Sequence, residues 1–581
     1  MNRYASVFLV VSFISLFGSG ECIAQEVETR LSAEQLFQPD HIVEVEIEVS
    51  QQDWDTIRLQ SRNIATALEK KPAESPFTYV KGNVTIDGVL IKNVGIRKKG
   101  FVGSLSEDRP SLKIKFSEYQ DQDPVEGISR LTLNNNNQDP TRICQYLSYR
   151  MFRDSGTVAS RCNFAKVTVN GEYLGIYSNV ESIRKPMLER GFGDGSGALF
   201  EGTVTDFLVD WVDKFEKKNK PAKTSYIRKI AELVDADEAV DIEKLDKRMD
   251  IDAFISFWAM ESLIGFWDGY CNNQNNFFVY RNPDDKKMYF IPWGTDSAFT
   301  ERMPLPPFRV RPRSVHCQAI LPNRLYRVPE IRNRYQERLM TFLDEHWNEE
   351  QLLAELDQLE AMLKDHLLDE DSFSSAMRTY RRFVKKRRER ILEDFEDGAP
   401  KLLAMHRQPA YFVEVGTARV DFSTEWFDKT PEDGSTVGQV ELELIMNGQV
   451  VEFENVGAFA ETSKWPSPGG QQPPSIQIVG VRKSDGKKLT LATGVSIEAF
   501  QADKDDVEVG GIYMVGQQFM NSEGRMVIIG GQASFDQAEM KTGETVQGSM
   551  KLTIREMRGG KPRDDEASAA PDADEDKKDD N

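Results

Sequence analysis

The residues that could do chemistry gather in one stretch, "GFWDGYCNNQNNFFVYRNPDDKKMYFIPWGTDSAF", which covers residues 265–299. It holds two acids, Asp268 and Asp296, and between them a block of asparagines that includes Asn273 and Asn276. Carboxylate and amide oxygens are hard ligands that suit Mg²⁺, Mn²⁺ or Ca²⁺. Two neighbouring carboxylates repel each other unless a positive charge intervenes. If the fold brings these side chains together, they predict a site for a divalent cation.

A β-hairpin is the element that would bring them together. Residues 277–281 and 287–291 are largely apolar and aromatic, and the Asn-Pro-Asp-Asp turn between them predicts two paired strands. In this pairing Asn276 falls roughly opposite Pro292. One acid precedes the first strand and the other follows the second, so both are expected at the open end of the hairpin.

The order acid, amide, hairpin, acid is the order of the parts that kinases use for phosphoryl transfer. In kinases one aspartate orients the attacking hydroxyl, an asparagine holds a metal ion, and a later aspartate holds metal that bridges the phosphates. The alternative interpretation is a polar loop in which the Asp and Asn side chains only satisfy turns. The pattern alone leaves both interpretations open.

Length and charge restrict the class of protein. A chain of 581 residues is too long for one core, so two or three domains are expected. The formal net charge of −21 argues against a general nucleic-acid-binding protein, which would carry a basic surface. The basic run "RTYRRFVKKRRER" at 378–390 is followed by acids, and we interpret it as a solvated helix face. No nucleic-acid partner is predicted.

The first 24 residues have the features of a secretory signal peptide. Arg3 supplies the positive start, and the apolar run from Val7 to Phe17 has 11 residues, fewer than the roughly 20 that a membrane span needs. Ala24 suits cleavage, with Cys22 at the −3 position. The chain is therefore expected to be secreted or to reside in the periplasm or cell envelope, with no integral membrane span after cleavage.

Cleavage after Ala24 would leave four cysteines: Cys144, Cys162, Cys271 and Cys317. An even number of cysteines in an exported protein allows disulfides, and the pairs considered are Cys144–Cys162 and Cys271–Cys317. The alternative is four buried free thiols. The spacings do not match a zinc site.

Apolar periodicity and turn signals predict the elements around the 265–299 stretch. A helix capped by Asp139 is expected to end before Gly156. The other predicted elements are a strand at 41–50, a helix at 53–62, strands within 77–100 and at 111–116, a hairpin with an Asn-Gly turn at 170–171, a buried helix at 252–264, and helices near 322–347, 350–367 and 372–394.

The character of the sequence changes near residue 405. Residues 410–557 consist of strand-like segments separated by Gly, Pro, Asp and Asn turns, which predicts a separate β-sandwich or barrel-like domain. Residues 558–581 are rich in acids and short of large apolar side chains, so a disordered acidic tail is expected. Residues 25–40 are expected to form a flexible lead-in.

The central stretch resembles the signature of the spore-coat-protein-H (CotH) kinase family, in which an Asp and an Asn precede an aromatic strand and Pro-Trp-Asp-x-Asp follows. Three further motifs agree in order: "VGIRKKGFVGS" with "RPSLKIKF", "LTLNNNNQDPTRICQYLSYRMFRDSG", and "VTVNGEYLGIYSNVESI". They cover about residues 40–305. The resemblance implies an α+β fold, with an atypical protein-kinase-like domain over 41–400 followed by the separate all-β domain.

The resemblance also implies an activity and its cofactors. CotH family members use ATP and a divalent metal, here Mg²⁺ or Mn²⁺, and are linked to phosphorylation of Ser or Thr in secreted or coat proteins. By this resemblance Asp268 is the catalytic base and Asp296 a metal ligand. Asn276 matches the family's amide position, whereas Asn273 matches the five-residue offset of ordinary kinases. A protein substrate is the expected partner.

Cationic side chains are needed to offset the phosphate charge. Lys113 or Arg97 would suit this role, and Glu181 could hold one of them as an ion pair. Lys99 and Arg109 are further candidates. The alternative for each is an ordinary solvated position on a strand.

The sequence departs from the family at two points. Gly294 stands where the family often has an acid, and no clean G-x-G-x-x-G loop is present, so "GIRKKGFVGS" would have to cover the phosphates. Two other functions therefore stay open. One is a non-catalytic kinase-like scaffold or binding protein of the envelope or surface, and the other is a structural protein stabilised by Ca²⁺.

Overall fold

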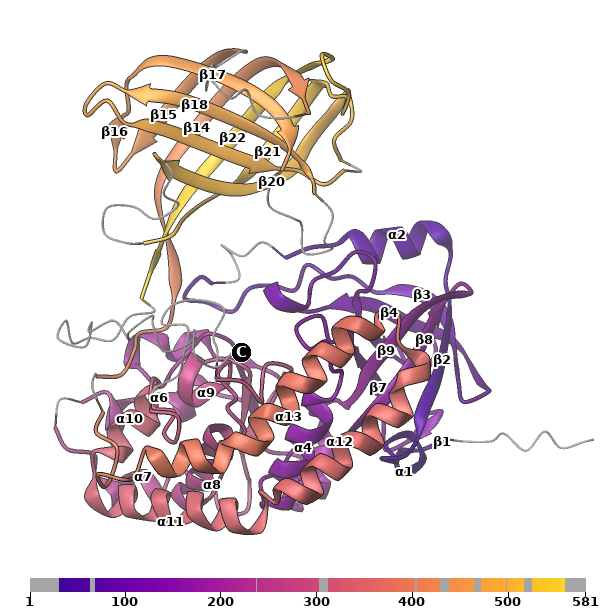
Figure 1. Cartoon of the computed structure of the whole chain (residues 1–581), viewed down its shortest axis with the longest axis vertical. Coiled ribbons are helices and arrows are strands. Elements are labelled where there is room, and N and C mark those ends of the chain that lie inside the picture. Colours follow the sequence, from indigo (N-terminus) through magenta and orange to yellow (C-terminus); the bar gives the residue numbers. More distant parts are fainter. Residues whose placement is uncertain are drawn as a thin grey trace, which may run out of the picture.

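The structure is a computed structural model that describes residues 31–62, 68–236, 238–301, 312–402, 405–428, 438–463, 472–497, 499–516 and 525–559. It combines helices and sheets in three parts: an N-terminal barrel, a helical part with a small sheet, and a C-terminal sheet (Figure 1). The predicted signal peptide and the tail from residue 560 lie outside the described residues.

The N-terminal barrel is closed, with strand order β2-β3-β4-β5-β7-β9-β8. Its hairpins follow the sequence signals: Asn170 and Gly171 both have positive φ, 51° and 85°, as the predicted Asn-Gly turn requires. The strands are β2 (Ile42–Glu48), β3 (Val80–Ile86), β4 (Val89–Lys99), β5 (Ser111–Lys115), β7 (Arg130–Asn134), β8 (Cys162–Val169) and β9 (Glu172–Glu181), with helix α2 (Gln51–Leu59) and the 3₁₀ turn η1 (Val102–Ser104) between them.

The expected flexible lead-in is part of the fold from residue 31 onward. Strand β1 (Leu31–Ser32) pairs in parallel with β6 (Val125–Glu126), and α1 (Ala33–Leu36) begins with a capping box between Ser32 and Gln35. Leu36 is fully buried in the core of the barrel. The hydrophobic residues of this segment therefore anchor it.

The helical part surrounds the predicted buried helix, α8, which is apolar on nearly all sides. The predicted helix near 322–347 is two helices, because Pro329 begins a new one. The helices are α4 (Cys144–Asp154), α5 (Lys185–Phe192), α6 (Thr224–Val234), α7 (Ile242–Asp246), α8 (Ile251–Leu263), α9 (Tyr270–Asn273), α10 (Ile320–Tyr326), α11 (Pro329–Glu345), α12 (Glu349–Leu363) and α13 (Glu370–Glu393), with 3₁₀ turns η2 (Val209–Lys214) and η3 (Lys364–His366).

The predicted hairpin exists and belongs to a four-stranded sheet. The sheet order is β11 (Glu216–Lys217), β10 (Ala198–Gly202), β12 (Phe277–Arg281) and β13 (Met288–Pro292). Its register pairs Phe277 with Pro292, so the expected pairing of Asn276 with Pro292 was wrong by one residue. The Trp293 amide donates to the Asn276 carbonyl at 3.1 Å instead, which extends the hairpin by one bond toward the two acids.

Between residues 411 and 558, the described residues form one sheet of β-strands and no helix. Strand β14 pairs with β15 and β17 on one side and with β22 on the other, and the β14–β22 pairing joins the sheet into a ring. Tyr411 pairs with Arg558, so the chain enters and leaves the sheet at adjacent points. The strands are β14 (Tyr411–Phe427), β15 (Gln439–Met446), β16 (Gln449–Val450), β17 (Phe453–Thr462), β18 (Pro474–Arg482), β19 (Lys488–Gly494), β20 (Lys504–Val515), β21 (Val527–Gln537) and β22 (Thr545–Arg558).

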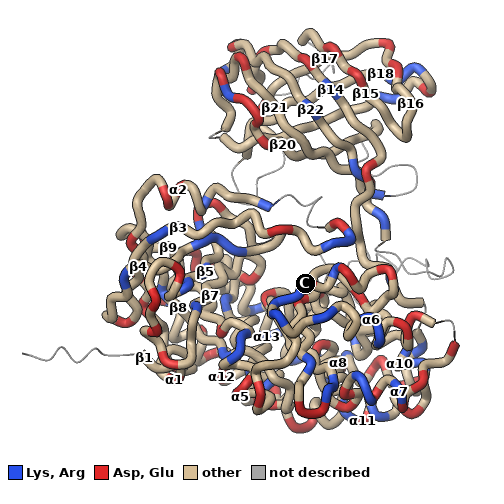
Figure 2. The backbone as a smooth tube through the Cα atoms, turned by 180° about the vertical axis from the view of Figure 1, so that it is seen from behind, with Lys and Arg blue, Asp and Glu red and all other residues tan. Residues whose placement is uncertain are grey.

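The basic residues of α13 are matched by acids of helix α12 and by Glu301, which follows β13. Arg388 donates to Glu349 at 2.8 Å, Arg381 to Asp357 at 2.6 Å, and the buried Arg387 to Glu301 at 3.0 Å. Figure 2 shows both signs of charge side by side over the helices. The run is balanced by charge, but by these acids rather than by those that follow it, and Arg387 is buried rather than solvated.

The cysteines differ from the disulfide expectation. Cys144, Cys162, Cys271 and Cys317 are all buried free thiols, and neither considered disulfide is formed. The thiol of Cys144 donates to the Ala298 carbonyl at 3.6 Å, so it points toward the loop after β13. None of the helices in the described ranges has an apolar stretch long enough to span a bilayer.

Candidate active site

Asp268 lies in the loop between α8 and α9, and three asparagine amides donate to its carboxylate. Asn273 and Asn275 donate to Oδ1 at 2.6 and 3.2 Å, and Asn276 donates to Oδ2 at 2.8 Å. Burial raises the pKa of Asp268 to about 6, although these three hydrogen bonds lower it. A pKa near neutral suits a general base, which must accept a proton and release it again.

The asparagine block folds around Asp268 because its backbone turns sharply. Gln274 and Asn276 have positive φ of 56° and 53°, in the left-handed region that ends α9 and opens β12. Two of the asparagines also contact other parts of the chain. The Asn275 side-chain oxygen accepts from the Val204 amide at 3.3 Å, and the Asn276 main-chain carbonyl accepts from the Trp293 amide.

Asp296 follows β13 and is buried, with a relative exposure of 6 %. Burial, and then the negative charge of Asp268, raise the pKa of Asp296 to about 7, while the Lys99 ammonium lowers it. The two predicted acids therefore act on each other across one site. The hairpin brings them together at its open end, as the sequence predicted.

The donor set fits a divalent cation by charge and by ligand type. Asp139 also raises the pKa of Asp296, so negative charge is in excess around it. Within the described residues, no group of three or more His, Cys, Asp or Glu side chains forms a metal site by itself. An amide oxygen or phosphate oxygens would therefore have to complete the ligand set, which is how Mg²⁺ is commonly bound.

Basic side chains of the barrel act on the same region. The β4–β5 register places Arg97 opposite Lys113, and Lys99 lies on the same face two residues along. Burial lowers the pKa of Lys99 to about 8, while Asp296 raises it. Burial, then the charges of Arg97, Arg184 and Lys99, hold the pKa of Lys113 well below its usual value. Positive charge is thus in excess here and negative charge in excess at Asp296.

Glu201, on β10, is a member of the site that sequence reasoning missed. It accepts from Lys218 at 2.7 Å, and its charge raises the pKa of both Lys99 and Lys113. No local motif marks Glu201, because it reaches these lysines only through the packing of the small sheet against the barrel.

Two buried acids that were also missed hold the helix after Asp268. Glu261 accepts from the Tyr270 and Cys271 amides at 3.0 and 2.8 Å. Asp206 accepts from the Tyr270 hydroxyl at 2.8 Å and from Gln274 at 2.7 Å. Burial raises the pKa of Glu261 to about 7 and that of Asp206 to about 6. An acid inside the otherwise apolar run of α8 was the one available signal.

Comparison with known proteins decides the family. The sequence matches the CotH kinase protein family over residues 96–395, just over half of the chain. The chain belongs to the CotH kinase family. The resemblance seen in the sequence is confirmed, and the matched residues include Asp268, Asp296 and Lys99.

Curated CotH relatives are distant and only partly covered. Invasin CotH2 of Rhizopus delemar is 24% identical over 203 residues, which are 32% of this chain and 34% of that protein. Inner spore coat protein H of Bacillus subtilis is 24% identical over 212 residues, 34% of this chain and 57% of that protein. The chain thus matches less than two thirds of the length of these relatives.

One solved structure was also compared. The Helicobacter pylori proinflammatory kinase CtkA shares 9% sequence identity with this chain, at a TM-score of 0.22, and the comparison covers 49% of this chain and 91% of that one.

The expected ion pair of Glu181 needs correction. Glu181 does not pair with Lys113 or Arg97: it accepts from Arg161 at 2.9 Å and from Arg190. Its strand, β9, lies beyond β7 from β5, so two strand spacings separate it from Lys113. Arg109, the further candidate cation, donates to the Leu174 carbonyl at 2.6 Å.

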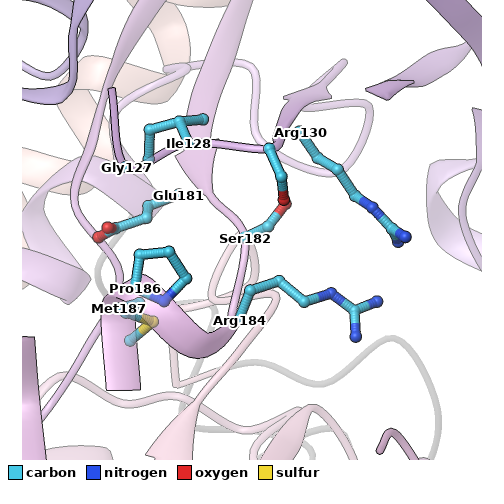
Figure 3. A pocket seen from close by; sticks show the side chains of 9 residues that line it. Gly127, Ile128, Arg130, Glu181, Ser182, Arg184, Pro186 and Met187 are labelled. Carbon is cyan, nitrogen blue, oxygen red and sulfur yellow. The ribbon is translucent and has the colours of Figure 1, made fainter. Parts of the chain in front are cut away.

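A small pocket beside Glu181 is distinct from the site of the two aspartates. Its lining includes Arg130, Glu181, Ser182 and Arg184. Figure 3 shows the guanidinium groups of Arg130 and Arg184 on one side and the Glu181 carboxylate on the other. Arg184 acts on Lys113 electrostatically, so the pocket borders the cationic part of the site.

Gly294, the departure from the CotH pattern, has a structural reason in this chain. Its φ is +54°, and its amide donates to the Tyr149 hydroxyl at 3.0 Å. A Cβ on Gly294 would lie 3.0 Å from Asn276 Oδ1. An acid at this position would therefore strain the backbone and press on an amide that holds Asp268.

Proposed function

We propose that this chain is a protein kinase of the CotH type, which transfers the γ-phosphoryl group of ATP to Ser or Thr of a protein substrate. One observation carries the proposal: the Asn276 amide donates to Asp268 at 2.8 Å, and its carbonyl accepts from Trp293 at the end of the hairpin that leads to Asp296. Both acids therefore lie at one end of the hairpin, where Lys99 of the barrel also acts on Asp296. An excess of negative charge facing an excess of positive charge is what a metal-bound nucleotide would bridge.

Each side chain has a role in this proposal. Asp268, held by three amides, accepts the proton of the substrate hydroxyl while the hydroxyl oxygen forms a bond to the γ-phosphorus. The bond from that phosphorus to the bridging oxygen breaks, and ADP carries the electron pair away. In this proposal Lys99 and Lys113 offset the charge of the phosphates, and the Glu201 carboxylate favours the charged form of both.

Asp296 and Asn276 would hold Mg²⁺ or Mn²⁺. Bound there, the ion would offset the charge of the phosphates and of the two carboxylates. Asn276 is favoured over Asn273 as the amide ligand, because the Asn273 oxygen already accepts from Arg407 at 2.7 Å. The Asn276 oxygen instead lies against Gly294.

The remaining assignments belong to the same proposal. Residues 41–400 would form the kinase-like catalytic domain, and 410–557 an accessory all-β domain. Two relatives are named an invasin and an inner spore coat protein, which supports a protein substrate at a cell surface or envelope. The predicted signal peptide at 1–24 would deliver the chain there.

Transfer of label from γ-labelled ATP tests the proposal. The full chain, with Mn²⁺ or Mg²⁺, is expected to phosphorylate itself or a generic protein such as casein. Asp268→Ala should lower the rate by about 10³-fold, the middle of the range for losing a general base. Asp284→Ala is the matched control, because Asp284 lies in the exposed turn at the far end of the same hairpin. Equal rates for both variants would refute the proposed role.

A non-catalytic scaffold is the second candidate, favoured by Gly294 at the family's frequent acid position. In that function the kinase-like part or the C-terminal sheet binds a partner without transfer. A scaffold would show no metal-dependent transfer and would keep its partner after Asp268→Ala.

A further inference from the structure

The segment that leads into the C-terminal sheet contacts the Asp268 loop directly. Residues 405–410 precede β14, and they lie beyond residue 395, where the match to the CotH family ends. Arg407 of this segment donates from Nη2 to Asn273 Oδ1 at 2.7 Å and from Nε to Gln274 Oε1 at 3.2 Å. The guanidinium thus grips the amide oxygens of two consecutive residues of the Asp268 loop.

The contact fixes which way the Asn273 amide faces. Its oxygen accepts from the Arg407 guanidinium, and its nitrogen donates to the Asp268 carboxylate at 2.6 Å. A guanidinium can only donate and an ionised carboxylate can only accept. The reversed amide would set donor against donor and acceptor against acceptor, so the two charges together hold one orientation.

Main-chain bonds hold Arg407 itself in place. Its amide donates to the Gln318 carbonyl at 2.7 Å, and its carbonyl accepts from the Gln274 side chain at 2.7 Å. Gln274 also donates to the buried Asp206. Farther along, the Phe412 amide donates to the Leu68 carbonyl at 3.4 Å, and Tyr411 packs edge-on against Trp211 with 5.6 Å between ring centroids.

We propose that Arg407 is a positioning residue for Asp268, which acts by holding the Asn273 amide in the orientation that donates to the carboxylate. The inference rests on the proposed kinase function for its effect on rate, but the contact itself is independent of that function. It also means that the candidate site is completed by a segment outside the family-matched region, at the entrance to the C-terminal sheet.

A double-mutant cycle on the full chain tests whether Arg407 acts through Asn273. The variants are Arg407→Met, Asn273→Ala and the double variant, each measured by urea unfolding and by phosphoryl transfer. Arg407→Met is expected to lower kcat by roughly tenfold to a hundredfold, the range for a misplaced catalytic group. The KM for ATP should change by less than about twofold, because Arg407 has no role at the nucleotide phosphates. In the Asn273→Ala background the same substitution should change kcat by less than about twofold.

Two controls separate positioning from general destabilisation. Arg324→Met removes a comparable half-buried arginine of α10, which donates to the Ala236 carbonyl at 2.7 Å. Its effects on unfolding free energy and on kcat should be additive with those of Asn273→Ala. Arg407→Lys should recover part of the lost kcat, because an ammonium can still donate to the Asn273 oxygen.

The outcomes distinguish this proposal from the proposed function. If the changes in unfolding free energy caused by Arg407→Met and Asn273→Ala are additive, the positioning role is overturned, whatever the activity. The role is also overturned if the two substitutions are coupled in unfolding free energy but their separate effects on kcat simply multiply in the double variant. If the wild type transfers no phosphate, the kinase function fails, and the unfolding cycle alone decides whether Arg407 holds Asn273 on Asp268.

Discussion

The acids and the cations of the candidate site are held in different ways. Asp268 and Asp296 are brought together by one hairpin and a block of asparagines close to them in sequence. Lys99 and Lys113 reach the same region from the barrel, through strand register and the packing of Glu201 from another sheet. The positions of the two acids can be predicted from a short motif, whereas the positions of the two lysines depend on the complete fold.

Among the cations of the site, the largest expected effect comes from removing Lys99, which acts on Asp296. Lys99→Met should lower kcat/KM for ATP by about 10²-fold, because a positive charge is lost where the phosphates would bind. Lys113→Met should have a smaller effect, since Lys113 has Arg97 and Arg184 beside it. Initial rates at varied ATP concentration provide the measurement. A greater loss for Lys113→Met than for Lys99→Met would reverse the assignment of the two lysines.

Substitution of Glu181 should have the opposite effect: it should lower the stability of the fold strongly and leave the rate of phosphoryl transfer nearly unchanged. Glu181→Gln leaves Arg161 and Arg190 without their buried carboxylate, which should cost about 2–3 kcal/mol of unfolding free energy. Phosphoryl transfer at 25 °C should stay within about twofold, because Glu181 contacts no residue of the Asp268 site. Urea unfolding and initial rates measured on one preparation check both parts. If Glu181→Gln lowered the phosphoryl-transfer rate as much as Lys99→Met does, Glu181 would belong to the candidate site after all.

Asp296 should make the protein less stable when no metal is bound. Its folded pKa of about 7 lies above the value of 3.8 for a free side chain, so the folded state binds the extra proton between these values. Stability from this group is therefore present below pH 4 and lost as pH rises through 7. The Asn side chain carries no charge. In the presence of a chelator at pH 8, the free energy of unfolding of Asp296→Asn should therefore exceed that of the wild type by about 1–3 kcal/mol.

The pH dependence is the control for that prediction. The advantage of Asp296→Asn should shrink as pH falls from 8 to 4, because wild-type Asp296 then becomes neutral as well. A difference that stays constant over this range would contradict the raised pKa of Asp296, which burial and then the charge of Asp268 produce.

Gly294 should give the smallest effect. Gly294→Ala places a Cβ at positive φ and 3.0 Å from Asn276 Oδ1, which should cost about 1 kcal/mol of unfolding free energy. Gly156→Ala is a matched control, because Gly156 has φ +82° but nothing within 4 Å of the added Cβ. The rate should fall more for Gly294→Ala than for Gly156→Ala. Equal rates would show that the Asn276 amide tolerates displacement.

The sequence predicted the parts of the site that are close together along the chain. The hairpin, the Asn-Gly turn at 170–171, the buried α8 and the convergence of Asp268 with Asp296 all follow from local pattern. Lys99 was named only as a further candidate cation, and the roles of Glu201 and Arg407 could not be predicted, because each depends on packing between distant segments. The expected Lys113–Glu181 pair was wrong for the same reason, since strand order within the barrel separates them.

Calorimetric titration of Mn²⁺ into the full chain, with a non-hydrolysable ATP analogue present, tests the central claim most directly. The claim is that Asp296 and Asn276 hold one cation together with a nucleotide, beside Asp268. The account predicts one site in the wild type that needs the nucleotide, weakened by about tenfold or more in Asp296→Asn. Mn²⁺ binding of equal affinity in both proteins, or binding that ignores the nucleotide, would contradict it.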